Sequence, residues 1–276
     1  MKPFYDILQR VQQEAPLVHC ITNTVTINDC ANAALACGGR PIMADDPSEA
    51  AEVTALAKAL VLNTGTLHQH TIPAMFASGQ AANERGIPVI LDPVGAGVSR
   101  FRTEHILRLL EQIQFSVIRG NRSELNAIAH GCANRNGVDA GAEPMNGEQL
   151  EETLAFAGRL SRSTGAVIAV TGATDIVTDG QTAYRIRNGH PQMARITGTG
   201  CMLSTVTGVY CAANPDCLLE ATAAAVSVFG LCGERGAELA AQAGNGIGTG
   251  SLKRYLFDCL STGTPETLLG GMKIEI

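Results

Sequence analysis

Several features are scarce or missing in this sequence. Its 276 residues include no tryptophan, 4% aromatic residues and 17% charged residues, whereas charged residues make up roughly 25% of typical soluble domains. The low charged fraction predicts extensive burial and some apolar surface that meets another subunit. The net charge of −6 comes without any Lys/Arg cluster, so we do not expect the chain to bind nucleic acid.

Membrane and secretion signals are also missing. The longest apolar stretch, residues 221–232, is too short to span a bilayer. The first ten residues carry charges at Lys2, Asp6 and Arg10, so they do not form a signal-peptide core. The nine cysteines are odd in number and contain no C-x-x-C pair, which is typical of free thiols in a reducing compartment. We therefore expect a cytoplasmic protein without membrane contact.

The common phosphate-binding signatures are absent. There is no G-x-x-x-x-G-K-[ST] loop and no protein-kinase motif set. The glycines at 244–250 do not form G-x-G-x-x-G, and they follow a predicted helix rather than a strand. Neither a P-loop protein nor a Rossmann dehydrogenase is expected.

Short apolar runs alternate with helical segments along the chain. Continuous apolar strands separated by helices predict an α/β fold with a mostly parallel central sheet and helices on both faces. The expected strands are 17–21, 42–44, 59–62, 87–91, 115–118 and 166–170, with a hairpin of 175–178 and 182–187; the expected helices are 4–14, 27–37, one that starts at 45–49, 71–85, 103–112, 123–129, 147–164, 221–240 and 251–261. Residues 131–147 have few anchors and are expected to form an excursion. No domain boundary is evident, so we expect one domain over residues 1–276.

Polar and glycine residues follow the ends of these strands repeatedly, and ligands bind beyond the carboxyl ends of parallel strands. Asp92 and Glu124 are acids that could hold Mg²⁺, largely through water. Arg119 and Thr171 could contact phosphate oxygens. Each residue also has a plainer interpretation: Asp92 shapes a turn before Pro93, Glu124 stabilises the N-terminus of its helix, and Arg119 is a surface charge.

The stretch from residue 194 to 214 is predicted to lie at the centre of the protein. Small residues at 197–200 lead into a helix with an apolar stripe that ends at Asn214. A glycine turn before a helix N-terminus gathers free N–H groups and binds anions. Cys201 stands at this junction, where we predict a thiol more acidic than usual. The alternative is a flexible turn that leads into a packed helix.

The loop at 22–26, sequence TNTVT, follows the first predicted strand. Its hydroxyl and amide groups suit a substrate loop, although a turn with capping side chains explains them nearly as well. Asn23 and Val25 are therefore candidates for substrate contact.

Five motifs together resemble the hydroxyethylthiazole kinase family of the ribokinase-like superfamily: NTVTINDCAN (23–32), PIMAD (41–45), LDPVGAG (91–97), RGNRSE (119–124) and ITGTGCML (196–203). They occur in the family's order over roughly residues 4–262. The resemblance implies a ribokinase-like fold and phosphorylation of the hydroxyl of 4-methyl-5-(2-hydroxyethyl)thiazole by ATP with Mg²⁺, in thiamine salvage. It also implies a homotrimer whose substrate site lies at the subunit boundary.

The same resemblance implies roles for single residues. Met43 contacts the thiazole and Gly198 lies beside the reacting alcohol. Arg119 and Thr171 bind ATP, and Asn121 with Glu124 matches the superfamily's N-x-x-E pattern at the nucleotide and metal site. Cys201 receives the proton or merely lines the site; in the wider superfamily an aspartate commonly stands there as the base.

Three departures from the family pattern bear on the site. Gly39-Arg40 replaces a smaller pair, which predicts a different substrate mouth. Arg122 replaces a small residue and is expected to add positive charge near the metal site. The segment 248–252, GTGSL, matches only approximately.

Three other functions compete with this interpretation. One is a kinase for another small alcohol, such as the pyrimidine half of thiamine. Another is a hydrolase or acyltransferase with Cys201 as nucleophile, for which His19 is the best-placed histidine. The third is a non-catalytic regulator that binds the thiazole.

Overall fold

The computed structural model describes residues 2–131, 146–244 and 246–276. In this part of the chain one sheet has the order β2-β1-β3-β4-β5-β6-β7-β8-β9. Neighbours from β2 to β6 are parallel, and β7, β8 and β9 are added antiparallel. The strands are β1 (Leu17–Ile21), β2 (Arg40–Ile42), β3 (Ala59–Asn63), β4 (Val89–Asp92), β5 (Val117–Asn121), β6 (Val167–Thr171), β7 (Asp175–Thr178), β8 (Ala183–Ile186) and β9 (Ile274–Glu275).

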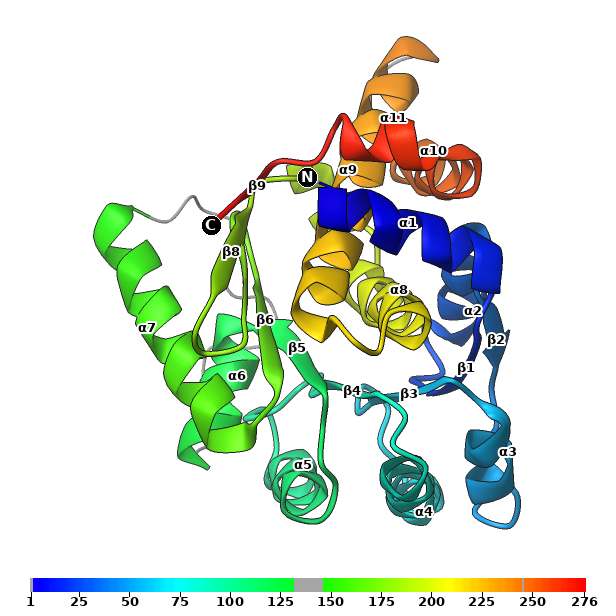
Figure 1. Ribbon diagram of the computed structural model, residues 1–276, viewed down its shortest axis with the longest axis vertical. Coiled ribbons are helices and arrows are strands. Elements are labelled where there is room, and N and C mark those ends of the chain that lie inside the picture. Colours follow the sequence, from blue (N-terminus) through cyan, green and yellow to red (C-terminus); the bar gives the residue numbers. More distant parts are fainter. Residues whose placement is uncertain (1, 132–145, 245) are drawn as a thin grey trace.

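Helices cover both faces of this sheet (Figure 1), which confirms the predicted fold class. One face carries α1 (Lys2–Glu14), α2 (Ile27–Ala36), α8 (Thr199–Ala213), α9 (Leu218–Gln242), α10 (Thr249–Thr262) and α11 (Pro265–Leu269). The other carries α3 (Ala50–Leu56), α4 (Thr71–Glu84), α5 (Arg100–Gln112), α6 (Arg122–His130) and α7 (Gly147–Thr164). None of the described helices is long and apolar enough to cross a membrane.

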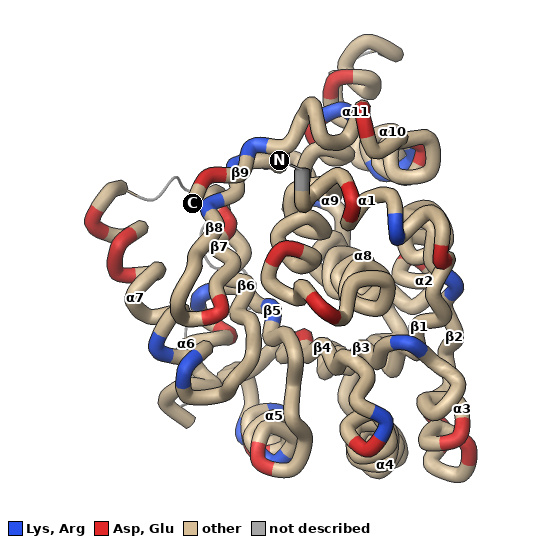
Figure 2. Tube along the Cα trace, in the orientation of Figure 1, with Lys and Arg blue, Asp and Glu red and all other residues tan. Residues whose placement is uncertain are grey.

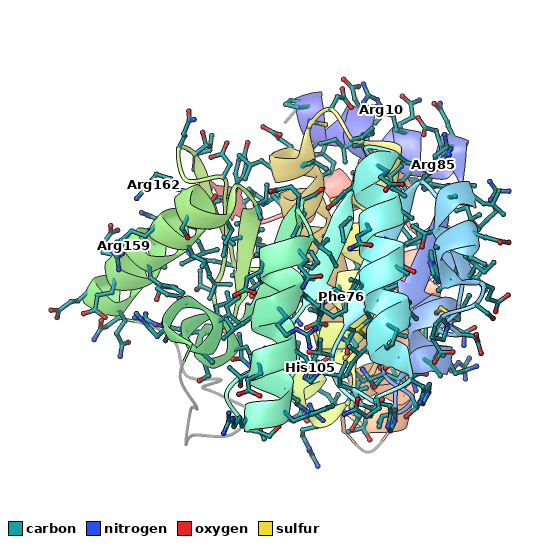
Figure 3. The ribbon with its side chains drawn as sticks, turned by 90° about the horizontal axis from the view of Figure 1, so that it is seen from below. Arg10, Phe76, Arg85, His105, Arg159 and Arg162 are labelled. Carbon is teal, nitrogen blue, oxygen red and sulfur yellow. The ribbon has the colours of Figure 1, made fainter. Side chains whose placement is uncertain are left out.

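The sheet separates two hydrophobic cores because successive side chains of a strand point to opposite faces. In β3, Val61 packs in the core beneath α8 and α9, whereas Leu60 and Leu62 pack in the core beneath α4 and α5. Figure 3 shows α4 and α5 side by side on the second face. There the Arg108 guanidinium lies 5.4 Å from the ring centre of Phe76.

Helix α8 forms the centre of the molecule, as the sequence predicted for residues 194–214. It carries no charged residue (Figure 2), and its residues from Cys201 to Ala213 are all buried. A Cβ atom at Gly208 would lie 2.5 Å from Val61 Cγ2. Glycine at this position therefore lets the helix backbone lie directly on the sheet.

The strand order reverses at β1, since β2 pairs on one side of β1 and β3 on the other. Such a reversal opens a crevice at the carboxyl ends of the strands, where open α/β sheets bind ligands. The segments after β1, β3, β4, β5 and β6 all begin at this edge.

The structure differs from the sequence predictions mainly at element ends. Strand β2 occupies 40–42 rather than 42–44, and β4 and β5 extend to Asp92 and Asn121. The one-turn helix η1 (Pro191–Arg195), α11 and β9 were not predicted. Most of the expected excursion, residues 132–145, lies outside the described residues.

Candidate active site

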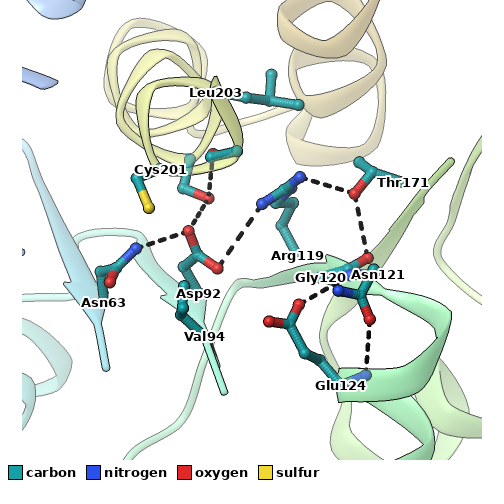
Figure 4. Close-up of polar contacts among 12 residues, drawn as sticks. Asn63, Asp92, Val94, Arg119, Gly120, Asn121, Glu124, Thr171, Cys201 and Leu203 are labelled. Atoms are coloured by element: carbon teal, nitrogen blue, oxygen red, sulfur yellow. Dashed lines mark hydrogen bonds and ion pairs between the residues drawn. The ribbon is translucent and has the colours of Figure 1, made fainter. Parts of the chain in front are cut away.

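Asp92 ends β4 at the carboxyl edge of the sheet, and its side chain is completely buried. Its Oδ2 accepts hydrogen bonds from Asn63 Nδ2 and Ser204 Oγ, each at 2.8 Å. Arg119 Nη1 lies 3.7 Å from Oδ1 (Figure 4). Burial raises the pKa of this carboxyl, and Arg119 opposes that shift. Asp92 therefore does more than shape a turn.

Arg119 connects this acid to the end of β6. Its Nη2 donates to Thr171 Oγ1 at 2.7 Å, and its side chain is 12% exposed. A Cβ atom at Gly200 would lie 2.7 Å from Nη1, so the guanidinium lies against the glycine turn. Its buried Nε has no hydrogen-bond partner. The interpretation of Arg119 as a surface charge is wrong.

The predicted glycine turn leads directly into α8. Gly198 is the N-cap residue with φ +85°, and no side chain caps the helix. The N–H groups of Thr199, Gly200 and Cys201 belong to the first turn, where an α-helix has no internal acceptors for them. Together with the helix dipole, they can stabilise an anion.

The predicted acidity of Cys201 is wrong. Its side chain is 9% exposed, and Sγ accepts a hydrogen bond from Asn23 Nδ2 at 3.1 Å. Burial and, next, the Asp92 carboxylate raise the pKa of the thiol to about 11. Desolvation and a nearby negative charge outweigh the helix dipole here, so the group is a neutral thiol at pH 7.

Asn23 and Asn63 join this thiol to Asp92. Asn63 Oδ1 accepts from Asn23 Nδ2 at 3.1 Å, while Asn63 Nδ2 donates to Asp92. Asn23 Oδ1 accepts from the backbone N–H and hydroxyl of Thr26, at 3.1 and 3.0 Å. Asn23 therefore forms the side-chain turn of the plainer interpretation, whereas the Thr26 side chain does not cap α2.

Asn63 and Ser204 are the site residues that sequence reasoning missed. Asn63 ends β3 at the same edge as Asp92, and Ser204 lies about one helical turn after Cys201. These two positions in the sequence were the only indication that both residues belong to the site. Their bonds to Asp92 depend on strand register and on the placement of α8, which no local pattern gives.

Glu124 stabilises the start of α6, as its plainer interpretation proposed. Its Oε2 accepts from the N–H of Asn121 at 3.0 Å, and Asn121 Oδ1 accepts from the N–H of Glu124 at 2.9 Å. Its Oε1 accepts from the N–H of Gly95 at 3.1 Å. Burial and then the charge of Asp92 raise the pKa of Glu124 to about 7. The two acids are therefore electrostatic neighbours.

The donor set fits a magnesium ion held mainly through water. Asp92 Oδ1 is buried and has no hydrogen-bond donor. Within the described ranges, no group of three or more His, Cys, Asp or Glu side chains could form a protein cage for a metal. Mg²⁺ prefers oxygen ligands and keeps several waters, so two carboxylates near the uncapped N-terminus of α8 suit it.

The remaining predicted residues lie outside this hydrogen-bonded group. Met43 is half-buried just after β2, and Val25, just before α2, is 66% exposed. Both belong to the β1–β2 side of the crevice.

Arg122 and Arg40, the two arginines that depart from the family pattern, do not contact the hydrogen-bonded group around Asp92. Arg122 contacts α7 through the Gln149 carbonyl at 3.3 Å and the Thr153 hydroxyl, so its expected charge beside the acids is not found. Arg40 Nε donates to the Ala15 carbonyl at 2.7 Å. A Cβ atom at residue 39 would lie 2.5 Å from a Val209 methyl, which explains the glycine there.

A cavity of about 430 Å³ opens beyond the ends of β8 and β9. Its lining combines charged groups with apolar residues of α9 and the segment before α10: Arg187, His190, Glu234, Ala237, Ile247 and Lys273 are among them. The chain runs from this cavity through η1 into the glycine turn.

Solved structures share the fold. The chain matches pyridoxal kinase from Staphylococcus aureus, solved with AMP-PCP and pyridoxal, at a TM-score of 0.55 and 15% identity, covering 79% of this chain and 87% of that one. A ribokinase-like protein from Enterococcus faecalis matches at 0.63 and 14% over 93% of both chains. These likenesses show that the chain has a ribokinase-like fold.

Sequence comparison narrows this class. The hydroxyethylthiazole kinase family model matches residues 8–266. A hydroxyethylthiazole kinase from Clostridium acetobutylicum is 50% identical, over 82% of this chain and 84% of the relative, and one from Desulfovibrio desulfuricans is 47% identical over 95% and 94%. The solved hydroxyethylthiazole kinase from Pyrococcus horikoshii has a TM-score of 0.87 and 35% identity, over 100% and 99%. The chain belongs to the hydroxyethylthiazole kinase family.

Proposed function

We propose that the protein transfers the γ-phosphoryl group of ATP to the hydroxyl of 4-methyl-5-(2-hydroxyethyl)thiazole, a step of thiamine salvage. Family membership supports the reaction. The observation that carries the assignment of the site is the bonded series Cys201–Asn23–Asn63–Asp92. It joins the loop after β1 to the acid and arginine beside the glycine turn.

Phosphoryl transfer needs positioning and charge stabilisation more than covalent help. The first-turn N–H groups of α8, together with Arg119 and Thr171, are placed to hold phosphate oxygens. Asp92, through the Oδ1 that accepts no hydrogen bond, and Glu124 would hold Mg²⁺ through water. When bound, Mg²⁺ neutralises phosphate charge. Asn121 fixes the Glu124 carboxylate by its backbone N–H.

We place the thiazole alcohol between the loop after β1 and the glycine turn. Asn23, Val25, Met43 and Gly198 border this space. The transition state of phosphoryl transfer is loose, so little negative charge develops on the alcohol before the new bond forms. A neutral Cys201 thiol, oriented by Asn23, therefore suffices to line the site.

The 430 Å³ cavity is the candidate site for the nucleoside end of ATP, because its lining residue His190 directly precedes η1, the turn that leads into Gly198. Ala241→Trp should fill it, since Ala241 lines the cavity and is exposed, and should raise the KM for ATP at least tenfold, with the KM for the alcohol within about twofold. Leu239→Trp is the matched control, since Leu239 is partly exposed on the same helix and does not line the cavity.

A homotrimer is the proposed assembly. Val25, Leu35 and Leu56 are 66%, 58% and 72% exposed, and they lie on segments that flank the edge strand β2. A neighbouring copy that covers them would close the thiazole side of the crevice. Light scattering on the purified protein measures the mass directly, and a monomer would contradict this assembly.

The decisive assay measures ADP release with a panel of alcohols that includes the thiazole and the pyrimidine of thiamine, with Mg²⁺ or with EDTA. Thiazole-dependent ADP release that EDTA abolishes is the expected result. A preference for the pyrimidine alcohol would assign the enzyme to another acceptor. Thiazole binding without turnover would indicate a regulator.

A further inference from the structure

The ion pair between Asp29 and Lys253 ties α2 to α10. Lys253 Nζ lies 2.6 Å from Asp29 Oδ2, and the side chains are 36% and 20% exposed. Between described side chains, no other hydrogen bond or ion pair joins these two helices. Asp29 is the third residue of α2 and Lys253 the fifth of α10.

The α2 end of this pair reaches the acceptor side of the site. Asp29 is three residues after Thr26, the N-cap of α2. Thr26 is held by Asn23, whose amide donates to Cys201. The Thr26 methyl also lies against Gly198, because a Cβ atom there would be 2.2 Å from it. A shift of the start of α2 therefore moves the groups around the alcohol.

The α10 end reaches the nucleotide side. Ile247, two residues before α10, lines the 430 Å³ cavity. Helix α10 also packs against η1, the turn that leads into Gly198. Lys253 thus extends from the helix that follows the cavity-lining Ile247 to the helix that follows the acceptor loop.

We propose that Asp29 and Lys253 are positioning residues that hold the acceptor loop against the nucleotide side, so that occupation of either site favours the other. The inference rests on the proposed kinase function. Neither residue touches the reacting atoms; each acts through the placement of its helix. Coupling between two binding sites is reciprocal, so loss of the pair should weaken both substrates together.

The test is steady-state kinetics on Asp29→Asn and Lys253→Met. Partly exposed pairs contribute modestly, so each variant should raise the KM values for ATP and for the thiazole alcohol about two- to fivefold, with kcat nearly unchanged. The double variant should equal either single one, because the interaction is already lost. The exchanged pair, Asp29→Lys with Lys253→Asp, should restore both KM values.

Arg10→Met is the matched control. It removes the 2.8 Å pair with Asp216, at the end of α8 opposite Cys201, and should leave both KM values unchanged. If the KM increases of the two single variants multiply in the double variant, the two residues act independently and the inference is overturned. So would unchanged KM values in the single variants. If the protein with the exchanged pair does not fold, the double variant still shows whether the two residues act through one shared interaction. A wild-type protein without thiazole-dependent ADP release would instead refute the proposed function.

Discussion

Gly198→Ala tests how the glycine turn is built. The residue has φ +85°, a conformation that costs a residue with a Cβ roughly 1–2 kcal/mol. The added methyl group would also lie 2.2 Å from Thr26 Cγ2 and 2.9 Å from Thr26 Cβ. Such overpacking typically costs about 1–3 kcal/mol. The added methyl group would therefore clash with Thr26, the N-cap of α2.

The cost of the positive φ and the cost of the clash with Thr26 can be measured separately. Gly86, after α4, has φ +66°, and a Cβ atom placed on it would meet no other atom within 4 Å, so Gly86→Ala incurs only the backbone cost. Gly198→Ala should lower the free energy of unfolding by about 1–3 kcal/mol more than this control, and it should reduce kcat/KM at least 100-fold by displacing Asn23 and the first turn of α8. Urea unfolding and the ADP-release assay measure the two effects.

A second substitution identifies the contact. Thr26→Ser removes the methyl group at 2.2 Å but keeps the hydroxyl that donates to Asn23. Combined with Gly198→Ala, it should recover part of the stability and of the activity. If Gly198→Ala matches Gly86→Ala in stability and keeps wild-type kcat/KM, the reasoning about this turn is refuted.

Four further predictions concern buried polar groups. Burial raises the pKa of Asp175 to about 7, so its contribution to stability is present below the pKa of an unfolded aspartate, near 4, and is lost as pH rises through 7. Asp175→Asn, which can still accept from Gly172, should flatten the fall in unfolding free energy between pH 4 and 8, on the order of 4 kcal/mol at most; an unchanged pH slope contradicts this. Glu124→Gln should weaken the Mg²⁺ dependence and cut turnover on the order of 100-fold with thiazole binding retained, and wild-type kinetics across a Mg²⁺ titration would remove Glu124 from the mechanism. Cys201→Ala should keep measurable kinase activity, losing roughly 10²- to 10⁴-fold at most, whereas a substrate-derived mass on the Cys201 peptide during turnover would establish the nucleophile mechanism. Asn63→Leu leaves Asn23 and Asp92 each short of a partner, at about 1–3 kcal/mol per group, and should lower kcat; retention of both stability and kcat would show that the bonded series is dispensable.

The α/β architecture could be read from the sequence because its evidence is local. Continuous apolar runs such as 59–62 specify buried parallel strands, and the residues that follow them mark the ligand edge. Strand β9 could not be predicted, since two residues become a strand only by pairing with β8.

The chemistry of the site was less predictable than its location. The pKa of Cys201 depends on its burial and on Asp92, which lies far earlier in the chain at the end of β4. The direction of the Arg122 side chain depends on α7. Asn121 and Glu124 were recognisable as a pair, yet their spacing suits a helix cap and a metal site equally well.

The placement of Asn23 beside Cys201 has a consequence for folding. These residues are 178 positions apart, and Asp92 and Ser204 are 112 apart. Contacts between such distant segments form only after a costly loop closure, so proteins rich in them fold slowly. Far-ultraviolet ellipticity of the helices should therefore return before catalysis during refolding. Recovery of turnover then reports the arrival of α8 on the sheet, which makes enzymatic activity a stricter measure of native structure than helix content.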